Sequence, residues 1–247
     1  MRNQSNKYAL KYALNFAIFC ILSTLISLIL VLPMMNFKFP LPSDDVMNNS
    51  NITIVIDPGH GGEDGGCEGN GLVEKDLNLD ISMRLASLLR KAGIKVVMTR
   101  ETDILLYDVN SDYKGQKKAQ DVRKRLEIAK NQENPFLISI HMNYFPQTQY
   151  SGLQVWYSKN DTHSQVLANL IQSNNKNTLQ PNNNRAIKEA TSSIFLLHNA
   201  TFPAILIECG FLSNSHEAHT LSDENYRQKL AEMIFKSIME YISHNNT

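Results

Sequence analysis

Residues 54–66 read IVIDPGHGGEDGG, and this stretch joins a predicted strand to a glycine-rich loop. A run of apolar, mostly β-branched residues ends there, and the loop that follows places His60 among five glycines. Such a loop after a buried strand is typical of phosphate sites, but neither the dinucleotide motif nor the P-loop spacing is complete here. Three acidic side chains in or beside the loop would also repel a polyphosphate: Glu63, Asp64 and Glu68. The stretch therefore argues against nucleotide binding.

Apolar runs with strand character alternate with amphipathic helical patterns along the rest of the chain. Strands are predicted at residues 52–57, 94–100, 135–141, 152–158, 193–199 and 203–209. Helices are predicted at residues 76–92, 117–132, 164–176 and 225–244. This alternation predicts a single α/β domain with a mainly parallel twisted sheet and helices on both of its faces.

The composition is that of an ordinary folded domain with an appendage. The chain has 247 residues, of which 43% are hydrophobic, and this is enough apolar material for a core. Its 24 basic and 24 acidic residues give a net charge of zero, so no nucleic acid partner is expected. Cys20, Cys67 and Cys209 are too few and too scattered for a disulfide framework or a cysteine zinc site.

The N-terminal region predicts a membrane anchor. Residues 13–32 contain no charged side chain and would form a helix of about 30 Å, which is the thickness of a bilayer core. The basic tail at residues 1–12 would stay in the cytoplasm. No small-residue cleavage site follows, so an uncleaved signal anchor is favoured over a cleaved secretory signal. Residues 33–51, with three prolines, predict a tether to a domain at residues 52–247 outside the cytoplasm.

Titratable side chains stand at the carboxyl ends of three predicted strands, where α/β sheets bind their ligands. His60 follows the first of these strands, His141 ends the third and Glu208 ends the last, while Glu74 begins the first helix. Two histidines and a carboxylate are the ligand set of a catalytic zinc. We therefore predict His60, Glu74 and His141 as ligands. Glu208 is then the general base for the zinc-bound water.

Asp57 and Asn143 are candidates for orienting the predicted ligands.

The predicted ligands and Glu208 each also have a purely structural alternative. A histidine at a strand end often makes only a local hydrogen bond. Glu74 near a helix start is favourable with the helix dipole. Glu208 is harder to explain structurally, since a carboxylate that leaves an apolar strand is costly unless it is paired or bound to a metal. The zincin motif H-E-x-x-H is absent, which excludes a helix-borne protease site.

Five segments occur in an order that resembles zinc-dependent N-acetylmuramoyl-L-alanine amidases of the amidase-3 group. They are IVIDPGHGGEDGG, EKDLNLDIS, VVMTRETD, ISIHMN and ILIECGFLSN. The resemblance runs from about residue 52 to the C-terminus. It implies one zinc ion per chain, bound by His60, Glu74 and His141, with Glu208 as the catalytic carboxylate. The implied substrate is peptidoglycan, cut between the lactyl group of N-acetylmuramic acid and L-alanine of the stem peptide.

The domain plan, without wall-binding repeats, is similar to that of amidases from endospore-forming bacteria that strip peptides from the spore cortex. This likeness implies a role before muramic-δ-lactam formation and germination. It also implies a membrane-anchored enzyme at the forespore or spore envelope, or a secreted one if the signal is cleaved. A catalytic domain without a wall-binding module further suggests dependence on an extracytoplasmic activator protein. Cys67, in the glycine loop, departs from the family pattern and has no assigned role.

Three arginines, Arg100, Arg125 and Arg185, stand where similar family sequences also have arginine. Guanidinium groups bind carboxylates such as those of stem peptides, and structural salt bridges are the alternative. Arg185 is favoured for substrate binding because its asparagine-rich loop can reach the cleft.

Two other functions of the protein stay open at this point. One is a zinc carboxypeptidase acting on wall peptides, and the other is an inactive, membrane-tethered wall-binding protein.

Overall fold

The computed structural model describes residues 52–108, 110 and 115–245. The predicted cytoplasmic tail (1–12), membrane span (13–32) and tether (33–51) lie outside the described residues. Within the described ranges, no helix is both long and apolar enough to cross a bilayer. The described residues fall within the predicted domain at residues 52–247.

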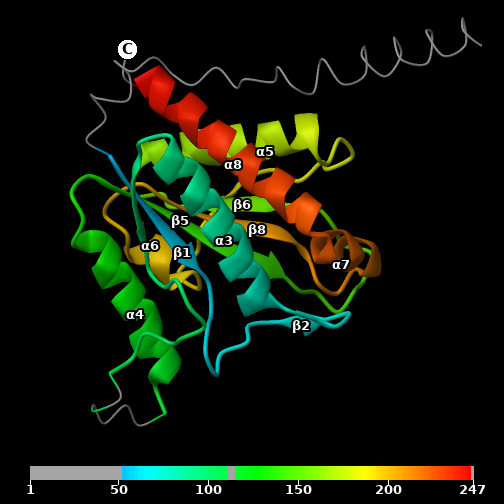
Figure 1. The fold of residues 1–247 in the computed structure, drawn as a ribbon, viewed down its shortest axis with the longest axis horizontal. Coiled ribbons are helices and arrows are strands. Elements are labelled where there is room, and N and C mark those ends of the chain that lie inside the picture. The colour runs from blue at the N-terminus through cyan, green and yellow to red at the C-terminus, as the bar shows by residue number, and fades with distance from the viewer. Residues whose placement is uncertain (1–51, 109, 111–114, 246–247) are drawn as a thin grey trace, which may run out of the picture. The chain divides into compact units, whose positions relative to one another are not determined.

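A six-stranded, mainly parallel sheet forms the centre of this domain (Figure 1). Its strands lie in the order β4 (Lys95–Met98), β1 (Thr53–Pro58), β5 (Pro135–Asn143), β8 (Ala204–Phe211), β6 (Gln154–Tyr157) and β7 (Lys188–Glu189). β1 pairs in parallel with β4 and β5, and β5 pairs in parallel with β8. β6 runs antiparallel to β8. The predicted mainly parallel sheet is confirmed.

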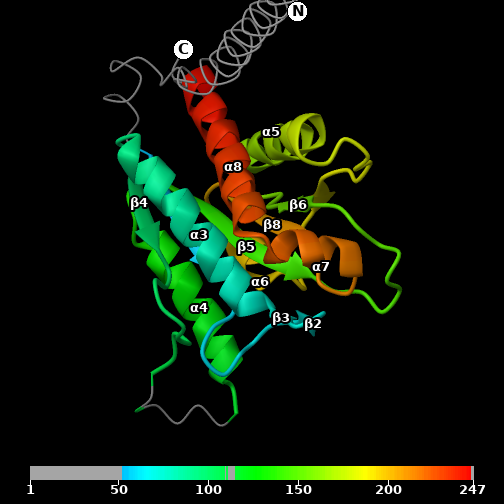
Figure 2. The same ribbon diagram turned by 45° about the vertical axis from the view of Figure 1, so that its right-hand side comes forward.

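Helices cover both faces of the sheet (Figures 1 and 2). The helices on one face are α3 (Glu74–Lys91), α5 (Thr162–Thr178) and α8 (Glu224–Asn245). Those on the other face are α4 (Lys117–Lys130) and α6 (Phe195–Asn199). Alternate residues of β1 explain this arrangement, because Ile54 and Ile56 join the first core whereas Val55 joins the second. The predicted packing of helices on both faces is confirmed.

The predicted strand at residues 193–199 is wrong. This segment contains the short helix α6, in which the Ala200 N–H donates to the Leu196 carbonyl at 3.0 Å. Leu196 and Leu197 are buried in the second core. A short apolar run fits a buried strand or a buried helix equally well, and periodicity alone does not separate them.

Two local elements that the sequence pattern did not predict lie close to the carboxyl edge of the sheet. A small hairpin of β2 (Glu68–Gly69) and β3 (Leu72–Val73) comes directly before α3 and so sets where Glu74 begins that helix. Helix α7 (Ser215–Ser222) follows β8. The Asn214 side chain caps it by accepting hydrogen bonds from the first backbone N–H groups.

Candidate metal centre

His60, Glu74 and His141 lie together at the carboxyl edge of the sheet. They come from the loop after β1, the first residue of α3 and the end of β5, and one possible ligand atom of each lies within 4.8 Å of the others. Glu74 Oε1 is 3.0 Å from His141 Nδ1 and 3.3 Å from His60 Nε2. The two imidazole rings are 5.1 Å apart between centroids and nearly perpendicular. The fold thus brings together the three residues that the sequence singles out.

The chemistry of this donor set fits a metal ion. Burial by itself would raise the pKa of Glu74, but hydrogen bonds with His141 and His60 outweigh burial and hold that pKa well below its usual range. Glu74 is therefore an anionic oxygen donor. Two imidazole nitrogens and one carboxylate oxygen form a set that binds zinc and leaves a further position for water. These three side chains can hold a divalent metal ion.

Two glycines of the loop make room for the cluster. A Cβ added to Gly59 would lie 2.2 Å from Cε1 of His141. A Cβ added to Gly66 would lie 2.5 Å from Oε2 of Glu74, and the φ angle of 74° at Gly66 also favours glycine. The glycine-rich composition of the loop therefore serves the close approach of polar side chains.

Glu208 stands beside His141 because the two are register partners on the parallel strands β5 and β8. Its Oε2 atom is buried and has no hydrogen-bond partner among the described residues. Burial raises the pKa of Glu208 well above its usual value, and the charge of Glu74 raises it further. A buried carboxyl oxygen without a hydrogen-bond partner is costly for folding, and perturbed carboxyl groups cluster at functional sites. The arrangement suits Glu208 to take up and release a proton beside the three-residue cluster.

Asp64 supports His60 from behind. His60 has a φ angle of 62°, in the left-handed region, and its Nδ1 lies 2.9 Å from Oδ2 of Asp64. The other carboxylate oxygen of Asp64 lies 2.6 Å from Lys118 Nζ. This contact leaves Nε2 of His60 facing Glu74, and carboxylates commonly orient metal-binding histidines in this way. Asp64 is not among the site residues predicted from the sequence.

Replacing Asp64 with Asn is expected to weaken metal binding by about 10- to 100-fold. The amide cannot supply the negative charge that orients the ring and raises the basicity of His60. Competition with a chelator of known affinity measures this change. Glu63→Gln is the matched control, because Glu63 pairs with Lys117 at 2.6 Å and should not affect metal affinity. Equal metal affinity of Asp64→Asn and the unchanged protein would contradict the orienting role.

Asp57 and Arg125 form a buried ion pair beneath the His60 loop. Arg125 Nη1 donates to Asp57 Oδ1 at 2.7 Å, and the two side chains are 2% and 1% exposed. The guanidinium also donates to the carbonyls of Pro58 and His60 at 2.6 Å each. Ser139 Oγ donates to the second carboxylate oxygen of Asp57 at 2.7 Å. Asp57 therefore helps to hold the backbone of the loop around His60 indirectly, by positioning Arg125. Its described hydrogen bonds do not reach the side chain of any predicted metal ligand.

Arg100 also holds this loop. Its Nε donates to the Pro58 carbonyl at 2.9 Å, and its Nη2 donates to the carbonyls of Gly59 and Lys75 at 3.0 and 2.8 Å. The side chain is 2% exposed. These contacts tie the loop to the start of α3, so they fit the structural alternative for Arg100 and Arg125.

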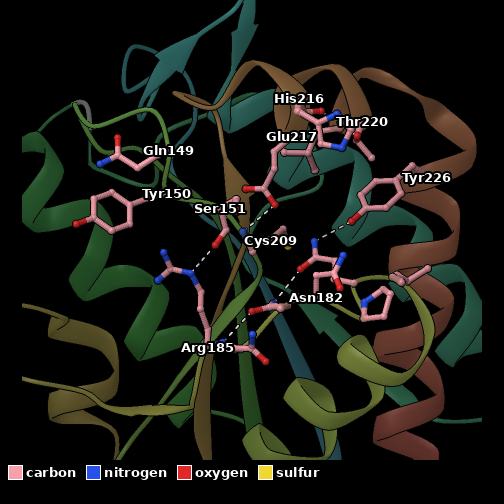
Figure 3. A pocket seen from close by; sticks show the side chains of 17 residues that line it. Gln149, Tyr150, Ser151, Asn182, Arg185, Cys209, His216, Glu217, Thr220 and Tyr226 are labelled. Carbon is pink, nitrogen blue, oxygen red and sulfur yellow. Dashed lines mark hydrogen bonds between the residues drawn. The ribbon is translucent and has the colours of Figure 1, made fainter.

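Arg185 lies at a pocket across β8 from the cluster. Its Nε donates to the Ser151 carbonyl at 2.7 Å, and its Nη1 donates at 3.0 Å to Oε1 of Gln154, which is the register partner of Glu208. The pocket has a volume of about 570 Å³ and lies between residues 149–152, residues 179–185 and α7 (Figure 3). Arg185 is thus the one arginine of the three that faces an open pocket.

Asn143 ends β5, and its backbone carbonyl accepts a hydrogen bond from the Leu212 N–H at 2.8 Å. This bond continues the pairing of β5 and β8 beyond a register shift between His141 and Asn143. Asn143 therefore contributes to the geometry of the edge through its backbone.

Comparison with known proteins identifies the family of the chain. The family model described as N-acetylmuramoyl-L-alanine amidase matches residues 54–240. The germination-specific N-acetylmuramoyl-L-alanine amidase of Bacillus subtilis (strain 168) is 37% identical over 190 residues, which cover 77% of this chain and 79% of the relative. The family match spans most of the described residues.

Two solved structures share the fold. The CwlD amidase from Clostridioides difficile, determined in complex with the GerS lipoprotein, superposes with a TM-score of 0.72 at 39% identity. That match covers 77% of this chain and 98% of the CwlD chain. The amidase AmiC2 of Nostoc punctiforme superposes with a TM-score of 0.66 at 29% identity, covering 78% of this chain and 98% of the other. The chain therefore belongs to the N-acetylmuramoyl-L-alanine amidases, hydrolases that act on peptidoglycan.

Proposed function

We propose that the enzyme uses one zinc ion, bound by His60, Glu74 and His141, to cut the amide bond between the lactyl group of N-acetylmuramic acid and L-alanine. The observation that carries this proposal is the convergence of the three side chains within 4.8 Å beside the buried, unpartnered oxygen of Glu208. A zinc ion in this position supplies Lewis-acid chemistry for the amide carbonyl and for the attacking water.

Glu208 is the proton carrier in this proposal. Its carboxylate accepts a proton from the attacking water and returns it to the nitrogen of L-alanine as the amide C–N bond breaks. Without a metal ion, burial and the neighbouring Glu74 raise the pKa of Glu208; a zinc ion at the cluster would lower that pKa and so favour the carboxylate that accepts the first proton. Asp64 keeps the imidazole of His60 in its binding orientation meanwhile.

The proposed setting is the spore cortex, where loss of stem peptides precedes muramic-δ-lactam formation and germination. The likeness to the germination-specific amidase of Bacillus subtilis supports this setting. Residues 13–32 would anchor the enzyme in the membrane through an uncleaved signal, residues 33–51 would act as the tether, and the catalytic domain from residue 52 would work outside the cytoplasm.

An extracytoplasmic protein partner completes the proposal. The CwlD amidase from Clostridioides difficile, which is 39% identical, was solved in complex with the GerS lipoprotein. A partner of the same kind would place or activate this chain.

The direct test is to incubate the purified full chain with peptidoglycan and identify the products by mass spectrometry. We expect stem peptides with a free L-alanine amine together with muramoyl residues that carry no peptide. Removing the metal with a chelator should stop product formation, and one equivalent of zinc should restore it. Stem peptides shortened by one residue would instead indicate a carboxypeptidase, and retention on the wall without any product would indicate an inactive wall-binding protein.

Arg185→Ala is expected to raise KM for stem peptides with free carboxylates by about 10- to 100-fold, because a charge-assisted hydrogen bond is lost. The KM for a substrate in which those carboxylates are amidated should change little. Lys188→Ala is the matched control, since this cation lies over the Trp156 ring at 5.1 Å and away from the pocket lining. An equal rise of KM for both substrates would assign Arg185 to structure alone.

A further inference from the structure

The connection between β5 and β6 exposes three aromatic side chains. Tyr144, Phe145 and Tyr150 are 48%, 44% and 44% exposed. They fall within seven residues of a chain in which only 8% of residues are aromatic, so the cluster is a local feature. Exposed apolar clusters of this kind often mark binding surfaces. We call residues 144–151 the aromatic loop.

Hydrogen bonds and ring packing hold the aromatic loop in place. The Phe145 N–H donates to Oγ of Ser213 at 3.1 Å, and the Asn214 side chain donates to the Thr148 carbonyl at 2.9 Å. The rings of Phe145 and Tyr150 meet edge to face at 5.0 Å. Because Ser213 and Asn214 follow β8, the loop is fixed to the end of the strand that carries Glu208.

The loop begins beside the metal cluster and ends at the Arg185 pocket. Tyr144 is three residues after His141, so their Cα atoms are at most about 11 Å apart. At the other end, Tyr150 lines the pocket, and the Ser151 carbonyl accepts the hydrogen bond from Arg185 (Figure 3). The exposed rings therefore border the region where substrate reaches the cluster.

We propose that the aromatic loop binds the glycan strand of peptidoglycan next to the muramoyl residue that is cut. This inference rests on the proposed function. The amide that is cut is attached to one sugar of a polymer, so the neighbouring sugars must lie on the surface that borders the cluster. Aromatic rings offer a flat apolar surface to the C–H faces of sugar rings. The glutamine and threonine side chains of the loop can bond to sugar hydroxyl and acetamido groups.

The charge of the loop favours a glycan over other occupants. Its sequence, YFPQTQYS, contains no charged residue. A loop that binds an anionic membrane surface would be expected to carry lysine or arginine beside its aromatic residues. The carboxylates of the stem peptide are better matched by Arg185 at the adjoining pocket.

The first experiment measures binding without turnover. The full zinc-loaded chain is sedimented with insoluble peptidoglycan whose stem peptides have been removed chemically. We expect Phe145→Ala combined with Tyr150→Ala to weaken retention about tenfold, while Tyr150→Phe keeps it. Phe195→Ala is the matched control, because Phe195 is an aromatic residue on α6 that is 37% exposed. Retention of the unchanged chain no greater than that of an unrelated protein would overturn the inference.

The second experiment compares two substrates for the same variants. For polymeric peptidoglycan, we expect KM of the double variant to rise about tenfold. For a single muramoyl peptide without neighbouring sugars, KM of the single variant Phe145→Ala should stay unchanged while its KM for the polymer rises, because Phe145 does not line the Arg185 pocket. An equal rise for both substrates, or no rise for either, would overturn the inference. One outcome separates the two proposals. If neither the parent protein nor any variant forms product, but the protein's retention on peptidoglycan still depends on Phe145 and Tyr150, then the proposed hydrolysis is wrong and the proposed glycan site is supported.

Discussion

Replacing Glu208 with Gln is expected to lower kcat by about 1,000-fold while the protein keeps its metal. The amide nearly matches the carboxyl group in shape but cannot accept the proton of the attacking water. Metal stays bound because the three side chains that converge on the metal position are His60, Glu74 and His141. Product formation from peptidoglycan measures the first effect, and elemental analysis of the purified protein measures the second.

A contrasting variant makes this prediction specific. His141→Ala removes one of the three converging donors, so it should lose both metal and turnover. Loss of metal from Glu208→Gln would make Glu208 a ligand, and retained turnover would remove it from the chemistry.

The stability of Glu208→Gln gives a second measurement. In the metal-free protein, burial and Glu74 raise the pKa of Glu208 above its unfolded value. A carboxyl of this kind binds its proton more tightly in the folded state, so its ionised form opposes folding at neutral pH. The variant should therefore be at least as stable as the unchanged protein when a chelator is present. A clear fall in Tm under those conditions would mean that Glu208 contributes to folding.

Arg125→Met is expected to have the largest effect on stability, lowering the free energy of unfolding by about 3–5 kcal/mol. The substitution leaves two buried carboxylates without their cation, those of Asp57 and Asp121, and Asp57 keeps only the neutral donors Thr99 and Ser139. In a domain of this size the loss corresponds to a fall in Tm of about 10 °C. It also removes the donors to the carbonyls of Pro58 and His60, so metal affinity should fall with it.

Acid should reduce the destabilisation caused by Arg125→Met. Burial raises the pKa of Asp57, but Arg125, Ser139 and Thr99 outweigh burial and lower it. In the unchanged protein, Asp57 therefore stabilises the fold above its unfolded pKa, and this contribution is lost as the pH falls through the lowered folded pKa. Without Arg125 the carboxyl can fold in its protonated form at low pH. Unfolding measured with chelator at neutral and acidic pH should show the larger difference at neutral pH.

A double-mutant cycle separates the ion pair from the rest of the Arg125 contacts. Adding Asp57→Asn to Arg125→Met removes the unpaired charge at position 57, while that of Asp121 is the same in both variants, so the double variant should be more stable than the sum of the two single effects predicts. Strict additivity would show that the pair contributes nothing as a pair.

Much of the sheet and of the site could be predicted from local pattern. Strands such as β1, β5 and β8 are apolar runs that end in a titratable or polar residue, and in a parallel sheet such ends meet at one edge. His60, Glu74, His141 and Glu208 could be found for this reason. The segment at residues 193–199 could not be assigned, because its length and composition suit both a strand and the helix that forms.

The sequence by itself determined most of the longer strands and helices, the apolar faces and the polar residues at strand ends, since these depend on near neighbours in the chain. The tertiary structure decided what each group meets across long separations. It turned β6 antiparallel to β8 and placed Arg125 under the His60 loop. It also made Gly59 necessary, because a ring 82 positions along the chain fills the space of its missing side chain. Such contacts arise only when packing brings distant segments together, and no local pattern contains them.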